Sequence, residues 1–153
     1  LFNNLKAQAT QLAKDAGQQA LEAVAEAKAN ADAAKAEKKA AAEARGKKVA
    51  SFEADKQKFT LYEHTIDKDG DEQPLAAVTA RLEAGEELQS RVTATRVALL
   101  GAFALAAKKK SGGTKFLTVE GPEFMWGAEV GRKSIKDAQK FMVAVNNQVK
   151  KNH

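Results

Sequence analysis

The spacing of apolar residues along the chain changes twice, and each change marks a different kind of element. In residues 1–45 they recur at steps of three and four, which places them on one face of a helix. This stripe, here called the seam, consists of Phe2, Leu5, Ala9, Leu12, Ala16, Ala20, Ala23, Ala27, Ala31 and Ala34. The spacing therefore predicts one long helix over residues 1–46, whose seam can pack against a partner helix as in a coiled coil.

From about residue 57 the period falls to two, which is typical of β-strands. We expect strands over residues 58–66, 73–82, 91–100, 114–121 and 123–130, with turns at 85–87 and 111–113. The pair Asp69-Gly70 favours a hairpin between the first two of these strands. Alternation in the last strand sends one of Met125 and Trp126 into the core, and we expect Trp126 to be a packing anchor.

The final segment returns to helical spacing and closes the fold. Its apolar face consists of Ile135, Ala138, Phe141, Met142, Val145 and Val149. Ser134 and Asp137 have the spacing of a capping box at its start. The whole pattern predicts an α+β fold with a helix over 1–46, a linker over 47–56, and a small antiparallel barrel or two-sheet sandwich over 57–150 that includes the C-terminal helix.

Composition changes the picture of the first helix. Residues 1–45 contain 17 Ala, and Gly17 is the only Gly or Pro among them. An Ala-lined seam lets two helix backbones approach closely but buries little area per residue, so the seam alone predicts a weak dimer that needs a higher-order assembly or an added surface. Two other interpretations stay open. The segment could be a solvated or partly disordered tail, or a membrane-surface helix that inserts Leu1, Phe2, Leu5 and Leu12.

Composition also limits the chemistry. The chain has no Cys, which excludes disulfides, Cys-based zinc sites and thiol nucleophiles. Its two His, at 64 and 153, accompany no nucleophile motif, so we expect a non-enzymatic protein without metal or cofactor. The longest apolar run, 97–107, has 11 residues, whereas a membrane-spanning helix needs about 20. We therefore expect a cytoplasmic protein, with peripheral membrane association as the alternative.

Three segments carry a family resemblance. RVTATRV (91–97), TKFLTVEGPEFMWGAEV (114–130) and SIKDAQKFMVAVNNQ (134–148) resemble the pleckstrin-homology-like (PH-like) domains of bacterial and phage proteins, over residues 57–149. The resemblance implies a bent seven-strand barrel, capped at one end by the C-terminal helix, that acts as a binding module. The first helix lies outside it.

The lipid function of the best-known PH-like branch is not expected to carry over. That branch binds phosphoinositides through Lys and Arg in the loop joining its first two strands, which we expect here at residues 67–72. This loop has four carboxylates against Lys68 and would repel an inositol phosphate. Calcium is not expected either, because counting from Asp67 puts Gly70 at position 4 instead of the required 6. A solvated hairpin turn is the favoured interpretation.

Basic residues gather elsewhere. The four candidate partner-binding residues surround a Ser-Gly-Gly turn and are Lys108, Lys109, Lys110 and Lys115. Residues 131–153 add six Lys or Arg against one Asp. This basic pole suits an acidic protein partner or phosphates. Nucleic acid is less favoured because no aromatic platform accompanies the lysines, since Phe116 should alternate into the core.

These observations lead to one main functional hypothesis and two alternatives. The main hypothesis is a structural or interaction protein that forms a homo-oligomer through the first helix, by Phe2, Leu5, Ala9, Leu12, Ala16, Ala20, Ala23 and Ala27, and so displays several PH-like modules. The first alternative is a peripheral membrane or lipid-body protein anchored by the same helix. The second is sequence-independent nucleic-acid binding through the basic pole.

Overall fold

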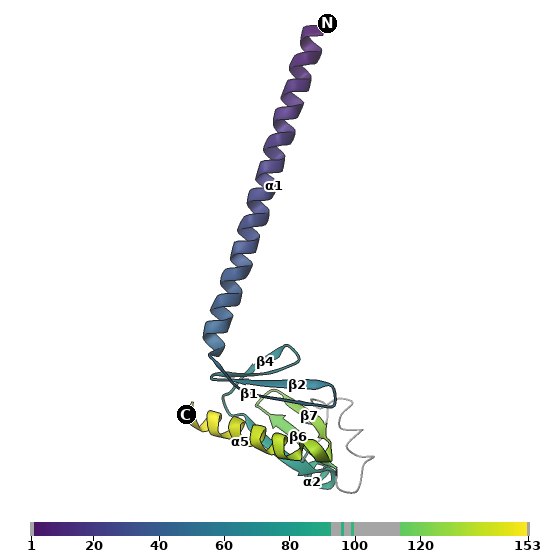
Figure 1. Cartoon of the computed structure of the whole chain (residues 1–153), viewed down its shortest axis with the longest axis vertical. Helices are drawn as coiled ribbons and strands as arrows, with labels where there is room; N and C mark the ends of the chain where they lie inside the picture. The colour runs from purple at the N-terminus through teal and green to yellow at the C-terminus, as the bar shows by residue number, and fades with distance from the viewer. Residues whose placement is uncertain (1, 93–95, 97–98, 100–113, 153) are drawn as a thin grey trace. The chain divides into compact units, whose positions relative to one another are not determined.

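The computed structural model describes residues 2–92, 96, 99 and 114–152, with side chains from Leu5 onward. The chain divides into two compact units, Leu1–Ala44 and Arg45–His153. The first unit is helical, and the second, called the β-unit here, contains two antiparallel sheets and a C-terminal helix (Figure 1). The predicted α+β class is therefore confirmed.

The first unit belongs to a single helix, α1, which runs from Phe2 to Arg45 as predicted. Ala has the highest helix propensity, and Gln, Lys, Glu and Leu rank close behind it, so the helix continues through Gly17 without a break. It ends before Gly46, whose φ of +75° is a left-handed conformation that terminates helices. All described side chains from Leu5 to Ala44 are exposed.

The described residues form seven strands in two sheets with only antiparallel pairing. The four-stranded sheet has the order β1 (Lys48–Ala54), β2 (Gln57–Tyr62), β3 (Thr65–Lys68), β4 (Asp71–Pro74). The three-stranded sheet has the order β5 (Thr79–Ala84), β6 (Lys115–Glu120), β7 (Met125–Val130). The other elements whose bounds are described are α2 (Gly85–Arg91), a short 3-10 turn (Arg132–Ser134) and α5 (Ile135–Lys151).

The predicted linker over 47–56 is wrong, because most of it forms β1. Phe52 is buried opposite Phe59 on β2 and stacks on Phe141, with ring centroids 6.0 Å apart. The turn between β1 and β2 is made by Asp55 and Lys56 at φ of 50° and 60°. The loop joining the first two strands is therefore this pair, and the acidic loop 67–72 instead spans the β3–β4 turn.

The Asp69-Gly70 hairpin is confirmed, with φ values of 52° and 95°. Its return strand is shorter than the predicted 73–82. Pro74 lacks the N–H needed to continue a ladder, and the chain turns at Leu75, whose carbonyl accepts the N–H of Val78 at 3.2 Å. Thr79 then starts β5 in the other sheet.

Two predictions after β5 are corrected. The expected turn at 85–87 is the first part of α2, which is capped because the Glu87 carboxylate accepts the Ala84 N–H at 2.8 Å. The expected strand over 91–100 is wrong where it is described, since Arg91 ends α2, and Arg96 and Leu99 are helical. The rest of that strand and the turn at 111–113 lie outside the described residues.

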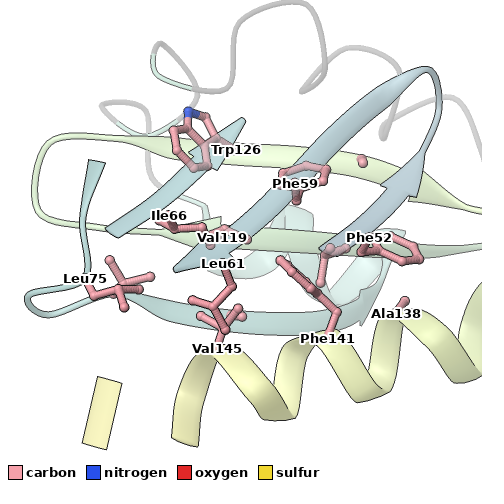
Figure 2. Close-up of a cluster of buried hydrophobic side chains, with 14 of the residues drawn as sticks. Phe52, Phe59, Leu61, Ile66, Leu75, Val119, Trp126, Ala138, Phe141 and Val145 are labelled. Carbon is pink, nitrogen blue, oxygen red and sulfur yellow. The ribbon is translucent and has the colours of Figure 1, made fainter. Parts of the chain in front are cut away.

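The strands at the C-terminal end agree with the expectation, and they bury both of their faces. Trp126 belongs to the main core with Phe59, Leu61 and Val119, as Figure 2 shows. Met125 is also buried, on the opposite face, together with Leu88 of α2 and with Phe116. Phe116 is thus buried as predicted, but α2 gives the sheet a second apolar layer that strand alternation alone does not reveal.

Helix α5 covers the main core with the predicted stripe. Ala138, Phe141, Val145 and Val149 are buried, and Figure 2 shows Phe141 and Val145 directed toward the strands. The expected capping box is wrong. Among the described residues, the Ser134 side chain makes no capping hydrogen bond, because Ser134 ends the preceding 3-10 turn with helical backbone angles.

Candidate functional site

The surface of α1 presents large apolar side chains to solvent. Leu5, Leu12, Leu21 and Val24 are 66%, 70%, 72% and 67% exposed. The predicted assembly residues from Leu5 to Ala27 all lie on this one helix with exposed side chains. Phe2 also lies in α1, although its side chain is outside the described part. The structure thus puts the seam on a continuous rod that is available for contact.

Leu21 is an apolar residue of α1 that the seam omits. It follows Leu12 by nine residues, which is about two and a half helical turns and places it on the opposite side of the helix. Gly17 and Val24 share its face at the i−4 and i+3 positions. A search for every large apolar residue, in place of the best single stripe, would have found it.

The charged residues of the first unit balance. Residues 1–44 contain six Lys against six Asp or Glu. Lys39 and Glu43 form an exposed i,i+4 ion pair at 3.9 Å, which stabilises a helix by only about 0.3–0.5 kcal/mol. The charges of α1 therefore sum to zero, although five of its six Lys share one side of the helix: Lys6, Lys14, Lys28, Lys35 and Lys39.

Of the four candidate partner-binding lysines, the structure describes Lys115. Lys115 begins β6, half-buried, opposite Ala84 and Val130. Lys108, Lys109 and Lys110 lie outside the described residues. The other half of the basic pole is exposed along α5, at Lys136, Lys140, Lys150 and Lys151. The single carboxylate there, Asp137, lies 3.8 Å from Lys140, so the outer face of α5 remains strongly basic.

The acidic β3–β4 hairpin uses its carboxylates to shape the turn. Asp69 Oδ1 accepts the backbone N–H of Lys58 at 2.9 Å, and Asp67 Oδ1 accepts that of Gly70 at 3.4 Å. Glu72 lies 3.4 Å from the guanidinium of Arg45, which also stacks over the Tyr62 ring at 5.0 Å. Within the described part of the chain, His, Asp and Glu form no group of three or more that could hold a metal ion.

A charged network that the sequence does not reveal ties α2 to the three-stranded sheet. The Arg91 guanidinium donates to both Glu83 oxygens, at 2.7 and 2.8 Å, and to Glu120 at 2.5 Å. Arg96 lies 2.6 Å from the other Glu120 oxygen. These residues are separated irregularly along the chain, so no spacing rule predicts their meeting.

The same network sets the protonation of Glu83. Burial alone would raise the pKa of this carboxyl, but hydrogen bonds from Arg91 and Thr118 outweigh burial and lower the pKa below 4.5. The Glu83 carboxylate also raises the pKa of Arg91. A cavity of about 240 Å³ adjoins the network, lined in part by Arg81, Arg96 and Glu120. Because the charges of Arg91, Arg96, Glu83 and Glu120 are already paired with one another, this arrangement is suited to a structural role.

Comparisons with known protein families, with curated proteins and with solved structures found no match for this chain. Its function must therefore be argued from its own residues. Of the helices that the structure describes, none combines the length and the apolar character needed to cross a bilayer.

Proposed function

We propose that this is a non-enzymatic structural protein that self-assembles through α1 and displays the β-unit as a PH-like binding module. The observation that carries the proposal is a 44-residue helix with large apolar side chains that remain about two-thirds exposed. Monomeric soluble proteins rarely leave extended apolar surface in water, and a rod with apolar side chains spaced by helical steps suits other rods.

The energetics favour several contacts over a single pair. Burying a Leu side chain contributes about 1.5–3 kcal/mol, so the Leu5 and Leu12 pairs of two seams together contribute about 6–12 kcal/mol. Association costs about 4–15 kcal/mol in lost freedom. A simple dimer is therefore marginal, and an assembly that adds contacts from the Ala positions and from further helices is better supported.

Charge favours copies of the chain over an anionic membrane as the partner of α1. Interfacial helices that bind anionic lipid carry Lys and Arg on the polar face. Residues 1–44 have no net charge, so an anionic bilayer gains no net electrostatic attraction over the whole helix, while neighbouring copies meet no net repulsion. The peripheral-membrane alternative is kept as an outcome of the test below.

The role of the β-unit rests on its architecture and its surface. Seven strands followed by a helix packed on the core agree with the module that the PH-like resemblance implies, although α2 separates β5 from β6. The exposed lysines of α5 offer a surface for an acidic partner. Several such surfaces joined in one assembly would raise the effective concentration of weak contacts, which is the mechanism proposed here.

The direct test introduces charge into the seam. Phe2→Asp with Leu5→Asp is expected to dissociate the assembly into single chains, measured by light scattering, because both apolar contacts are lost. Asn4→Asp with Gln18→Asp adds the same charge away from the seam and should leave the mass unchanged. A single-chain mass for the unaltered protein, together with flotation on anionic liposomes that the seam variant abolishes, would replace self-assembly by membrane binding.

A further inference from the structure

The charged residues of α1 are sorted by sign around the seam. At about 100° per residue, all six Lys lie on one side of the seam, and three of them lie about 80–120° from its middle: Lys6, Lys28 and Lys35. Four carboxylates lie about 60–120° from the middle on the other side: Asp15, Glu22, Glu26 and Glu37. All of these side chains are exposed. The seam is therefore bordered by a basic flank and an acidic flank, which these seven residues define.

Two flanks of opposite sign distinguish parallel from antiparallel helices. When two copies pack seam to seam and point the same way, the two-fold axis runs along the helices, and the basic flank of each copy faces the acidic flank of the other. When they point in opposite ways, the axis runs across the helices, so basic faces basic and acidic faces acidic. Charges beside the apolar stripe set the orientation of coiled coils for this reason.

The heights of the charges fit copies in the same register. Glu26 and Lys28 are two residues apart in the sequence, and so are Lys35 and Glu37. In two parallel copies without an offset, each of these acids lies within about 3 Å, along the helix axis, of a Lys of the other copy. Opposite charges thus meet at matching heights, and they do so on both sides of the seam.

The apolar residues of the seam favour the same arrangement. The large side chains lie near the start of the helix, at Phe2, Leu5 and Leu12, and from Ala16 onward the seam is Ala. Parallel copies in register place Leu5 on Leu5 and Leu12 on Leu12. A fully overlapped antiparallel pair would instead set each Leu against the Ala end of the other helix, where less apolar area is buried.

We propose that copies of α1 pack parallel and in register, with the basic flank of each against the acidic flank of its neighbour. This inference rests on the proposed self-assembly and adds its direction. Only Gly46 and Lys47 separate α1 from β1, so parallel helices bring every β-unit to the same end of the assembly. The basic outer faces of several α5 helices can then contact one acidic partner together.

Cysteine cross-linking tests the direction, because the chain has no Cys of its own. Ala9→Cys and Ala34→Cys each place one thiol on the seam, and the two full-length variants are mixed and mildly oxidised. Trypsin cleavage and mass spectrometry then identify which thiols are joined. Gln11→Cys is the matched control, since it lies about 140° from the middle of the seam. Light scattering under reducing conditions gives the mass of each variant.

Parallel packing predicts that each seam thiol is joined to its own counterpart. Mixed links between positions 9 and 34 should be absent, because these positions lie about 38 Å apart along the helix. The Gln11→Cys control should remain unlinked. Mixed links, or no links between counterparts in a chain whose mass is a multiple of 16.4 kDa, would overturn parallel packing and leave self-assembly intact. A single-chain mass at every concentration would overturn both proposals.

Charge substitutions test the flanks themselves. Glu22→Lys with Glu26→Lys turns the acidic flank basic and is expected to raise the concentration needed for assembly about tenfold at low ionic strength. Asp32→Lys with Glu43→Lys is the control, because it changes the net charge equally at positions almost opposite the seam. Circular dichroism verifies that both variants keep their helix. Equal effects of the two substitutions would show that net charge governs assembly and would overturn the role of the flanks.

Discussion

At the scale of single residues, the side-chain amide of Asn146 bonds to both backbone groups of Ala80. The Ala80 N–H donates to Asn146 Oδ1 and the Asn146 amide donates to the Ala80 carbonyl, each at 2.9 Å. Because β5 is an edge strand of its sheet, this one side chain from α5 satisfies backbone groups that the sheet leaves open. It ties the helix to the sheet by polar contacts as well as by the core.

Asn146→Ala should therefore destabilise the β-unit. Two hydrogen bonds are lost and two backbone groups lose their partner, which costs about 1–3 kcal/mol for each such group that stays buried. Urea unfolding followed by Trp126 fluorescence measures the change. The neighbouring exposed Asn147→Ala is the control and should change stability by less than about 0.5 kcal/mol. Equal effects of the two substitutions would contradict the role of the Asn146 amide.

The Glu83 carboxylate predicts a pH dependence of stability. Its pKa in the folded protein is lowered relative to 4.5, so folding favours the ionised form. The stabilisation is present above pH 4.5 and is lost as the pH falls through the lower folded pKa. Glu83→Gln should flatten the loss of stability that occurs as the pH falls below 4.5, measured by urea unfolding, whereas Glu86→Gln at an exposed position should not. The same pH profile in both variants would rule out the network as its source.

At the scale of elements, the β1–β2 hairpin contains a turn that its residues do not favour. Asp55 and Lys56 both have positive φ, which Gly adopts without steric cost but Lys does not. Lys56→Gly should stabilise the β-unit by up to about 1 kcal/mol, because the strain of a left-handed Lys is of that order. Lys58→Gly, inside β2, should do the opposite. A lower urea midpoint for Lys56→Gly would contradict the observed turn.

The elements that the sequence predicts well are those whose local signals agree with their tertiary contacts. The Ala content of α1 is enough to predict a helix, and the Asp69-Gly70 pair is enough to predict the β3–β4 hairpin. In α5 the 3.6-residue period of apolar residues marks the face that packs on the core. β1 was missed because the turn that pairs it carries Lys56 in place of the usual Gly. α2 was missed because Gly85 followed by two Glu is typical of a turn, while its capping by Glu87 depends on the chain direction after β5.

The candidate surfaces were predicted less completely than the fold. The seam follows from spacing alone, but Leu21 departs from that spacing, and a single-stripe reading of the helix excludes it. The network of Arg91, Glu83 and Glu120 depends on three elements meeting in space, which no local pattern encodes. The basic outer face of α5 could be inferred from charge count, because its lysines occupy the positions that the apolar stripe leaves for solvent.

At the scale of the whole molecule, each of the two units has one part of the proposed function: assembly for the first unit and partner binding for the β-unit. The first unit has the apolar surface and the neutral charge suited to copies of itself, and the β-unit has a closed core and a basic helix face suited to an acidic partner. Linking several β-units converts later binding events into intramolecular ones, which can raise avidity by about 10²–10⁴ without stronger single contacts. The function proposed for the chain therefore depends on whether α1 assembles.

The mass of the intact chain in solution, followed by sedimentation over a range of concentrations, tests this claim most directly. We predict a multiple of 16.4 kDa, with three or more copies at the higher concentrations and dissociation on dilution. A constant 16.4 kDa throughout that range would contradict the account.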